Sequence, residues 1–316
     1  MKLQRRKGHR SSNSCLMAMS YKFRNCVRLI VVGLLLTTML TWNKIRFQQK
    51  LFYCDKHCSP LLKTEENKTK IHLITNYALM YEPPWNQSQT ENSMERMQER
   101  QIELEETLQR NLNHYMIGSV HVIVNQEKAE KRLIELDLFN KHKLHVGRIE
   151  TMPTFKDFFQ YIRDDLLNRI VVLTNMDIYL GEGFEKLNHS LFLKYKVIYV
   201  LTRHGRREER CDMFNKPRYC GTGKVVSHDT YVLLPQADDF NQNILNEMNY
   251  PMNLMKAEYR LAWIFKNLMN RKLVNPCKLL KTYHNHCINI HGKHRPSIEK
   301  SRKRLLKVSP ANTLLP

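Results

Sequence analysis

A short polar segment at the end of an apolar run is where this sequence first suggests chemistry. The stretch "VVLTNMDIY" spans 171–179 and places Asn175 and Asp177 directly after β-branched hydrophobic residues. A carboxylate there is costly to desolvate unless something pairs with it. In extended backbone, residues two apart point to the same side, so Asn175 and Asp177 are expected to face one site. Their oxygen atoms suit a hard divalent ion, Mn²⁺ or Mg²⁺, that stabilises a departing diphosphate.

A purely structural role is the alternative for the same two residues. N-x-D is a weak motif, and Asn175 and Asp177 equally suit a turn that caps a helix over 181–184. The residues alone leave both interpretations open.

Five further side chains add to the first interpretation. Asp229 comes directly before the apolar run of "SHDTYVLLP", and Glu258 and Arg260 begin the helical pattern "KAEYRLAW". His284 and His286 alternate in "KTYHNH", so that in extended backbone they face the same way. A neutral histidine can complete a metal site or contact a phosphate. Taken singly, each residue also has a purely structural interpretation, in which Glu258 caps a helix and the histidines lie on the surface.

These residues need a framework of strands and helices to bring them together. Apolar runs predict strands at 71–77, 118–124, 145–150, 170–174, 195–202 and 223–235, and three-to-four spacing predicts helices at 94–115, 127–138, 155–166 and 257–269. Strands that alternate with helices favour a largely parallel sheet covered on both faces, with ligands at the carboxyl ends of the strands. We expect one α/β domain over 71–292.

Two of the helices have clear apolar stripes. The first is expected to bury Met97, Ile102, Leu104, Leu108 and Leu112. In the second, Thr154 is expected to be the N-cap, and the buried face consists of Phe155, Phe158, Phe159, Ile162 and Leu166.

The charge of the chain is concentrated at its ends. The net charge is +21, yet residues 51–292 hold 33 Lys and Arg against 29 Asp and Glu. This distribution argues against a nucleic-acid-binding domain. The segment 293–316 is predicted to be a basic, solvated tail, and the alternative is an anchor for an anionic partner, for which sulfated glycan is the expected chemistry.

The N-terminal charge accompanies an apolar segment over 29–42, "LIVVGLLLTTMLTW". It is shorter than the ~20 residues of a comfortable membrane-spanning helix, but flanking Arg and Lys side chains can extend it. Eight Lys and Arg precede it, which favours a cytoplasmic tail over 1–28, a single-pass signal anchor over 29–42 and a stem over 43–70. A cleaved signal peptide is the alternative.

Sequons and cysteines predict that the rest of the chain is lumenal. Three sequons begin at Asn67, Asn86 and Asn188. Six cysteines follow the apolar segment, and their proximity in sequence favours two disulfides, Cys211–Cys220 and Cys277–Cys287. Zinc is the competing interpretation, but the C-x₂-C spacing is absent. A short anchor and a lumenal body together predict a Golgi membrane protein of type II.

Several segments, in order, resemble a family of glycosyltransferase-like proteins of GT-A type. They are "RQIELEETLQRNL", "HVIV", "TFKDFFQYI", "NRIVVLTNMDIYL", "VIYVLTRHG", "SHDTYVL", "EYRLAWIF" and "LVNPCKLLKTYHNH". The resemblance covers about residues 71–290. It implies a single GT-A-like, Rossmann-like domain that binds a nucleotide-sugar donor and a divalent metal ion.

The resemblance also implies a role for each candidate residue. Asp177, His284 and His286 are expected to hold the metal ion, and Glu258 to act as the catalytic base, with Asp229 beside the sugar or the acceptor. The donor contacts that the resemblance implies are Thr75, Asn76, Tyr77, Asn175, Arg203 and Arg260.

Some positions depart from the pattern of that family. His228 stands where Gln is usual, Tyr231 where Trp is usual, and "MKAEYR" replaces "GCDNR", which lengthens the acid by one methylene. The expected function is transfer of a sugar from a nucleotide-sugar donor to a hydroxyl of a glycan or glycoprotein. The alternative is a catalytically impaired, lumenal glycan-binding or scaffold protein with the same fold.

Overall fold

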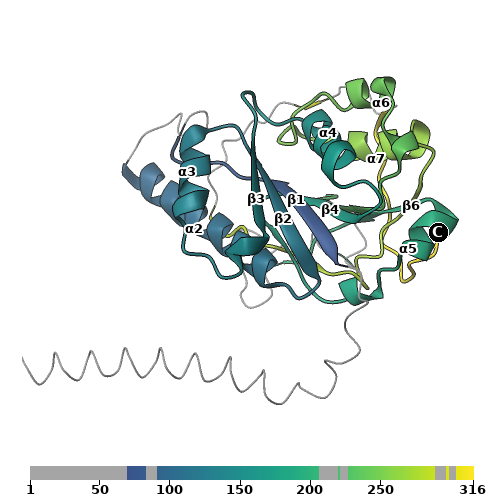
Figure 1. The fold of residues 1–316 in the computed structure, drawn as a ribbon, viewed down its shortest axis with the longest axis horizontal. Coiled ribbons are helices and arrows are strands. Elements are labelled where there is room, and N and C mark those ends of the chain that lie inside the picture. Colours follow the sequence, from purple (N-terminus) through teal and green to yellow (C-terminus); the bar gives the residue numbers. More distant parts are fainter. Residues whose placement is uncertain (1–69, 83–90, 206–219, 221–226, 289–296, 299–303) are drawn as a thin grey trace, which may run out of the picture. The chain divides into compact units, whose positions relative to one another are not determined.

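A seven-stranded mixed sheet forms the centre of the fold (Figure 1). In the order in which they pair, its strands are β3 (Leu144–Arg148), β2 (Ile117–Val124), β1 (Ile71–Asn76), β4 (Ile170–Thr174), β7 (Thr230–Leu233), β6 (Val197–Leu201) and β8 (Lys272–Val274). β7 is antiparallel to both of its neighbours, and the other pairs are parallel. The computed structural model describes residues 70–82, 91–205, 220, 227–288, 297–298 and 304–316. The predicted α/β class with a largely parallel sheet is confirmed.

Helices cover both faces of this sheet. One face packs against α2 (Glu91–Asn113), α3 (Glu127–Glu135) and α5 (His189–Tyr195), and the other against α4 (Phe155–Asp165), α6 (Gln242–Glu247) and α7 (Ala257–Asn267). Three-residue 3₁₀ helices lie at Lys141–Lys143, Phe184–Lys186 and Ala237–Asp239. The sequence pattern predicted α2, α3, α4 and α7, but α5 and α6 are too short to give a clear period.

β4, the strand that precedes Asn175 and Asp177, is buried on both sides. In β4, Ile170 and Val172 pack into the core on one face, and Val171 and Leu173 pack into the core on the other. Burial on both faces explains why the segment reads as a continuous apolar run. It also means that the first polar side chains after β4 emerge at an edge of the sheet.

The helix expectations hold with one exception. Thr154 is the N-cap of α4, and its side chain and that of Asp157 form a capping box. In α2, by contrast, the side chain of Ile102 is exposed, although the pattern placed it in the core. Arg100, Gln101 and Glu103 are buried instead. A polar stripe of α2 therefore faces the body of the domain.

A two-stranded antiparallel ribbon adjoins the sheet. Its strands are β5 (Ile178–Leu180) and β9 (Thr282–His284), and Ile178 lies opposite His284. Gly183 follows β5 with a φ of 100°, and a Cβ there would lie 1.8 Å from the carbonyl oxygen of Leu279. The turn after β5 therefore requires glycine.

The end of the chain belongs to the domain, contrary to the predicted boundary at 292. The backbone N–H of Val308 donates to His228 Nε2 at 3.0 Å, and that of Ala311 to the carbonyl of Asn275 at 2.7 Å. Leu306, Val308 and Leu314 are partly buried against the two cores. Charge density predicted a solvated tail, but the apolar residues Leu306, Val308 and Leu314 hold residues 304–316 on the body.

The predicted disulfides are wrong. Cys220 is bonded to Cys277, with Cα atoms 5.9 Å apart, which excludes both Cys211–Cys220 and Cys277–Cys287. Cys287 is itself disulfide-bonded. The reason is topological: β6 and β8 are parallel neighbours, so the segments that follow them leave the sheet at the same edge. Proximity in sequence therefore gave the wrong pairing.

Several predictions fall outside the described residues. These are the tail, anchor and stem over 1–69, the sequons at Asn67 and Asn86, and Cys54, Cys58 and Cys211. No helix within the part of the chain that the structure describes is both long and apolar enough to span a bilayer. The third sequon residue, Asn188, is exposed, and its side-chain oxygen caps α5 by accepting from the backbone N–H of Ser190.

Candidate functional site

Sheet topology brings three of the predicted residues to one edge. Asn175 follows β4, and Arg203 is the second residue after the end of β6, so both lie at the carboxyl ends of parallel strands. Asp229 directly precedes β7. Because β7 runs antiparallel to β4 and β6, the amino end of β7 lies at the same edge of the sheet as their carboxyl ends. Thr174 and Leu201 both pair with Thr230, one residue after Asp229. The antiparallel strand is therefore what makes this cluster.

Asp229 is the centre of the first cluster. Its Oδ1 accepts a hydrogen bond from Asn175 Nδ2 at 3.2 Å, and its Oδ2 accepts from an Arg203 guanidinium nitrogen at 2.9 Å. The hydroxyl of Ser227 donates to the same Oδ2 atom. The Asp229 side chain is 8% exposed. This carboxylate is thus held by three donors and has a fixed orientation.

Glu258 stands beside this cluster in the first turn of α7. Burial, together with the nearby Asp229 carboxylate, raises the pKa of Glu258 to about 7, although Arg203 and Lys307 act in the opposite direction. The side chain is only partly buried, so solvent and substrate can reach it. A carboxyl with a pKa near the working pH is suited to accept a proton.

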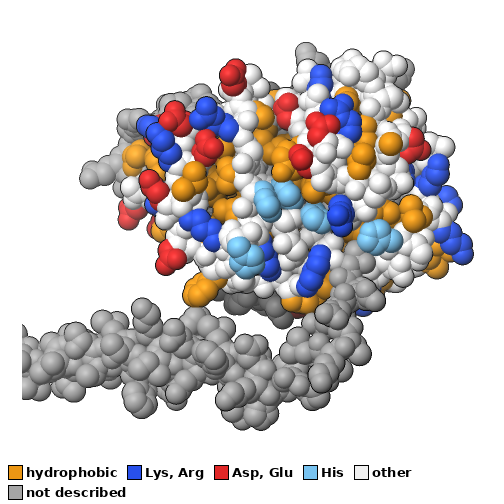
Figure 2. All heavy atoms as spheres, viewed as in Figure 1, with side chains coloured by type: hydrophobic (Ala, Val, Ile, Leu, Met, Phe, Trp, Pro, Cys, Tyr) orange, Lys and Arg blue, Asp and Glu red, His pale blue; other side chains and the backbone are white. Residues whose placement is uncertain are grey.

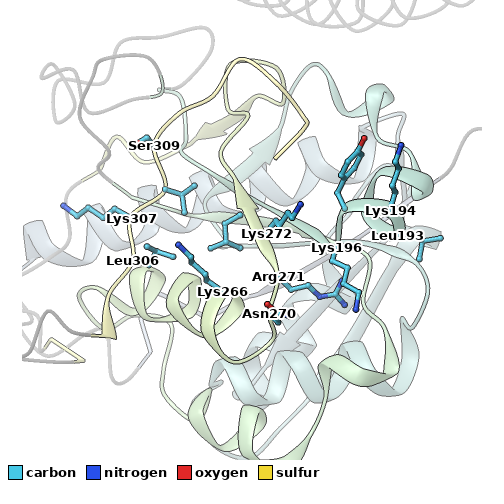
Figure 3. Close-up of a pocket in the computed structure, with 13 residues that line it drawn as sticks. Leu193, Lys194, Lys196, Lys266, Asn270, Arg271, Lys272, Leu306, Lys307 and Ser309 are labelled. Carbon is cyan, nitrogen blue, oxygen red and sulfur yellow. The ribbon is translucent and has the colours of Figure 1, made fainter.

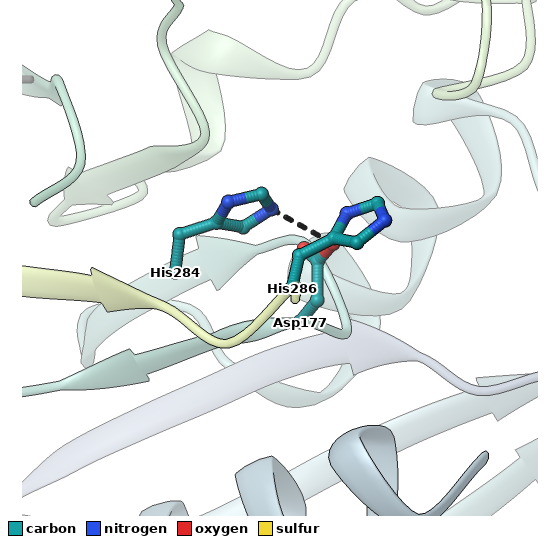
Figure 4. A group of neighbouring side chains, drawn as sticks. All are labelled: Asp177, His284 and His286. Carbon is teal, nitrogen blue, oxygen red and sulfur yellow. Dashed lines mark hydrogen bonds and ion pairs between the residues drawn. The ribbon is translucent and has the colours of Figure 1, made fainter. Parts of the chain in front are cut away.

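The ribbon of β5 and β9 builds a second cluster around Asp177. The backbone N–H of Asn285 donates to the carbonyl of Asp177 at 2.8 Å and fixes the register of the two segments. His284 Nε2 and His286 Nδ1 then lie 3.0 and 3.3 Å from Asp177 Oδ2. Figure 4 shows both imidazoles turned toward this carboxylate, with His284 at the end of β9 and His286 in the segment after it.

Arg100 of α2 completes the Asp177 cluster. Its guanidinium lies 2.5 Å from Asp177 Oδ2 and also donates to Glu103 Oε2 at 2.7 Å and to the carbonyl of Asn285 at 2.6 Å. Glu103 Oε1 accepts from the backbone N–H of Cys287 at 2.8 Å. The polar stripe of α2 thus holds the segment that carries the two histidines.

The charge states within this second cluster follow from its contacts. Burial by itself raises the pKa of Asp177, but His284, His286 and the Arg100 guanidinium outweigh it and hold the pKa well below its usual value. Burial, with a contribution from Arg203, lowers the pKa of His284 to about 4. A neutral His284 still donates its Nε2 proton to the carboxylate. Asp177 is therefore ionised, and His284 is neutral near pH 7.

The side chains of Asp177, His284 and His286 fit a divalent metal ion in their chemistry. Their donor atoms lie within 4.8 Å of one another. One carboxylate and two imidazoles suit Mn²⁺ better than Mg²⁺, which prefers oxygen ligands and retains water. Arg100 is a competing cation at the same oxygen, so the arrangement holds a charge-balanced carboxylate even without an ion.

Asn175 and Asp177 do not face the same site, which corrects the prediction from alternation. Residues 176–177 form a turn, and the backbone N–H of Ile178 donates to the carbonyl of Asn175 at 3.2 Å. The strand geometry that the prediction assumed ends at Thr174, so Asn175 turns to Asp229 and Asp177 to α2 and β9. The turn of the alternative interpretation is present, whereas its helix over 181–184 is replaced by β5 and the 3₁₀ helix that begins at Phe184.

Two other predicted contacts point elsewhere. The hydroxyl of Tyr77 donates to Glu105 at 3.0 Å and accepts from Gln101 at 2.7 Å, so its polar end is used in packing β1 against α2. Arg260 pairs with Glu247 of α6, and its guanidinium lies 4.6 Å from the ring centre of Trp263. Neither of these contacts lies at the two clusters.

Thr75 and Asn76, the other two residues of the predicted nucleoside pocket, end β1 next to β4. Thr75 is buried, and Asn76 Nδ2 lies 3.9 Å from the sulfur atom of Met176. Asn76 thus contacts the turn that separates Asn175 from Asp177. Their role in binding a nucleoside stays a prediction.

Sequence reasoning assigned no role to Arg100, Glu103 or Ser227. The signal for the first two was present, because Arg100 and Glu103 lie among the apolar residues of the α2 stripe, where charged side chains are costly to bury. Ser227 offered none, because only the folded chain brings its hydroxyl to Asp229.

Comparison with known proteins gives only distant likenesses. No family model matches the sequence, and no curated protein sequence matches it. Among solved structures, residues 1–349 of S. aureus TarS share 14% identity, with a TM-score of 0.40 over 68% of this chain and 60% of that one. The same TarS segment in complex with UDP-GlcNAc shares 15% identity, with a TM-score of 0.30 over 52% of this chain and 45% of that one. UDP-glucose pyrophosphorylase in complex with UDP-glucose shares 9% identity, with a TM-score of 0.33 over 68% of this chain and 90% of that one.

These likenesses leave the activity of the chain open. The chain spans less than two thirds of the length of the TarS structure that it matches. At such TM-scores the similarity assigns neither a fold family nor a substrate. A functional proposal for this chain therefore depends on the residues of the two clusters.

Proposed function

We propose that the chain is a GT-A-like glycosyltransferase that moves a sugar from a nucleotide-sugar donor to a hydroxyl of a glycan or glycoprotein. The main observation behind this proposal is a pair of carboxyls at one sheet edge whose pKa values are shifted in opposite directions. Asp177 is held ionised between two histidines, and Glu258 has a pKa of about 7. The segments that resemble GT-A-type proteins contain both residues. The proposed setting is the Golgi lumen, behind a signal anchor over 29–42.

Asp177, His284 and His286 are the residues that would hold a divalent ion, with Mn²⁺ favoured by the two imidazoles. Such an ion would act as a Lewis acid toward the diphosphate of the donor. Arg203 lies at the same edge, where its guanidinium can reach a donor phosphate while Asp229 and Asn175 keep it oriented.

Glu258 is the proposed general base. Its carboxylate takes the proton of the acceptor hydroxyl, and the hydroxyl oxygen forms a bond to the anomeric carbon of the donor sugar. The bond from that carbon to the diphosphate oxygen breaks, and the nucleoside diphosphate leaves. A base with a pKa near 7 is ionised for a large part of the time at neutral pH and still holds the proton well.

A second candidate, a glycan-binding or scaffold protein without transfer activity, is favoured by Arg100. The guanidinium already neutralises Asp177, and the Asp177, His284 and Arg100 side chains are only 14%, 5% and 3% exposed. In this candidate the cluster joins α2 to the ribbon and has no ligand. The family departures at His228, Tyr231 and Glu258 point the same way.

Thermal unfolding of the full-length chain with MnCl₂ and uridine diphosphate separates the two candidates. A ligand at about 100 times its Kd stabilises the folded state by about 2.7 kcal/mol, which corresponds to several degrees in Tm. We expect this shift in the wild type and not in Asp177→Ala or His286→Gln, each compared with its own ligand-free Tm.

Two outcomes would contradict the transferase proposal. An equal shift in Asp177→Ala would place the ligand elsewhere. A wild type that is stabilised but releases no sugar from any nucleotide-sugar donor would favour the binding protein.

A further inference from the structure

A groove of about 770 Å³ lies at the amino ends of β6 and β8 (Figure 3). Its walls are the end of α5, the end of α7 with the turn that follows it, the first residues of β8, and the C-terminal segment 306–309. The groove meets β6 and β8 at their amino ends, whereas Asn175 and Arg203 follow the carboxyl ends of parallel strands. Most of its lining therefore lies away from Asn175 and Arg203, and only the segment with Lys307 and Val308 also reaches the neighbours of Asp229 and Glu258.

The lining of this groove is basic. Five lysines contribute to it, Lys194, Lys196, Lys266, Lys272 and Lys307, and no Asp or Glu is among the described residues that line it. The groove also contains Arg271, but its guanidinium is bonded to Asp239 and is buried. On the face drawn in Figure 2, side chains of both signs are interspersed over α2 and α3, and Lys and Arg gather beside α5.

Only part of this charge has a structural explanation. Lys194 and Lys266 lie in the last turns of α5 and α7, where a cation is favourable to the helix dipole. The Lys194 and Lys307 ammonium groups lie 5.2 and 5.1 Å from the rings of Tyr195 and Tyr259. Lys196 and Lys272 have no such use.

Lys196 and Lys272 are brought together by the backbone itself. The N–H of Lys272 donates to the carbonyl of Lys196 at 3.0 Å, and both side chains are exposed. Lys266 is exposed on the same groove. No carboxylate in the described part of the chain forms an ion pair with any of the three. Three like charges gathered in a concave surface repel one another and favour an anionic ligand.

We infer that this groove binds an oligosaccharide that carries sulfate or carboxylate groups. A concave surface fits a discrete chain better than a flat membrane. Nucleic acid is disfavoured because Tyr195 is the one aromatic side chain among the described lining residues and Arg271 is engaged with Asp239. Leu273 and Val308 offer apolar surface to sugar rings, and Asn270 and Ser309 offer polar groups to hydroxyls. The inference goes beyond the proposed transfer and depends on no step of it.

Lysine acetylation footprinting of the full-length chain tests the inference residue by residue, so the basic segment over 1–50 does not confuse the result. The probes are a fully sulfated maltohexaose, unsulfated maltohexaose and inorganic tripolyphosphate. With the sulfated sugar, we expect acetylation of Lys196, Lys266 and Lys272 to slow at least threefold, while Lys128 and Lys131 of α3 react as before. The protection should weaken as salt is added.

A charge-matched pair of variants gives an independent measurement. Lys266→Gln/Lys272→Gln removes two groove charges, and Lys128→Gln/Lys131→Gln removes two from α3. Lys196 is left in place because its backbone has a φ of 48°, so a substitution there could change the stability of the turn as well as the charge. The groove variant should bind the sulfated sugar about tenfold more weakly than the control variant and should show a shallower salt dependence. Thermal unfolding without ligand checks that both variants fold.

The outcomes distinguish this inference from the proposed transfer. Equal acetylation of the groove and α3 lysines with and without the sulfated sugar would overturn it, as would equal affinity of the two variants. Protection by tripolyphosphate alone would overturn the glycan assignment. None of these results depends on donor binding or turnover, so a failed transfer assay would leave the groove as it is.

Discussion

Asp177 and Glu258, the two acids proposed to act in transfer, differ in what surrounds each of them. Asp177 contacts a guanidinium and two imidazoles, and these hold its pKa well below the usual value despite burial. Glu258 is dominated by burial, which raises its pKa to about 7, and Arg203 and Lys307 act on it only as weaker, opposing charges. Similar groups in one region therefore have pKa values that are shifted in opposite directions.

These different surroundings suit the two acids to different roles in the proposed transfer. An acid that stays ionised can hold a cation, whereas an acid near its pKa can take and return a proton. The division has a topological origin. Asp177 is enclosed by α2 and the ribbon of β5 and β9, while Glu258 lies at the start of α7 beside the amino end of β7.

The largest effect is expected from Glu258→Gln. A general base contributes about 10²–10⁴-fold to a rate, so transfer should fall by that amount. The stabilisation by MnCl₂ and uridine diphosphate should be unchanged, because the Asp177 cluster is intact. Glu130→Gln on α3 is the control and should retain full activity. An active Glu258→Gln enzyme would remove this residue as the base and, with it, the division of roles.

The next effect concerns stability and compares Asp177→Asn with Asp229→Asn. Breaking one partner of a buried ion pair costs about 3–5 kcal/mol, because the other charge stays buried. The Arg100 side chain is 3% exposed and Arg203 is 17% exposed, so the loss should be larger for Asp177→Asn. Urea unfolding at neutral pH, without added metal, measures both.

A double variant provides the check on that explanation. Arg100 also pairs with Glu103, so each single variant disturbs a shared network. In Arg100→Gln/Asp177→Asn the pair between these two side chains is lost only once, so the total loss of unfolding free energy should be smaller than the sum of the two single losses. If the double variant is less stable than the wild type by the full sum of the two single losses, the two side chains are not coupled, and Arg100 is not the partner that keeps Asp177 ionised.

Sequence patterns predicted the framework of the fold well where a segment is apolar and periodic. β1, β2, β4 and β6, and the capped helix α4, were expected within a few residues because burial on a face or a stripe leaves a visible pattern. The direction of β7 was not predicted, because a four-residue apolar strand reads the same in either direction. The short helices α5 and α6 were missed for a similar reason.

The candidate site was predictable in its residue types but not in its partners. Asp177, His284 and His286 were placed in one site by resemblance, and the ribbon does bring them together. Arg100 comes from a helix 77 residues before Asp177 and meets it only through packing. The same limit applies to Cys220 and Cys277, which are 57 residues apart. Contacts between distant segments depend on topology, which no local pattern of this chain contains.

A smaller effect is expected from pH, with opposite consequences for the two clusters. Glu258 must be ionised to act as a base, so log(kcat/KM) should rise by about one for each pH unit below its pKa of about 7 and level off above it. Asp177 has a lowered pKa, so its stabilising contribution is present above the usual value of 3.8 and is lost only as pH falls through the folded value. Between pH 5 and 8 the Asp177 contribution should therefore be flat, as a pH series of the difference in unfolding free energy between wild type and Asp177→Asn would show.

The smallest effect is expected at Arg203, which connects the two clusters. Its charge lowers the pKa of both Glu258 and His284, and its guanidinium is bonded to Asp229. In Arg203→Gln the pKa of Glu258 should rise, so the pH profile of kcat/KM should move to higher pH and the rate at pH 6 should fall about twofold more than the rate at pH 8. Arg203→Lys keeps the charge and should leave the profile in place. If the Gln and Lys variants lose activity by the same factor at every pH, Arg203 acts through its contacts alone, and the two carboxyls acquire their different states independently.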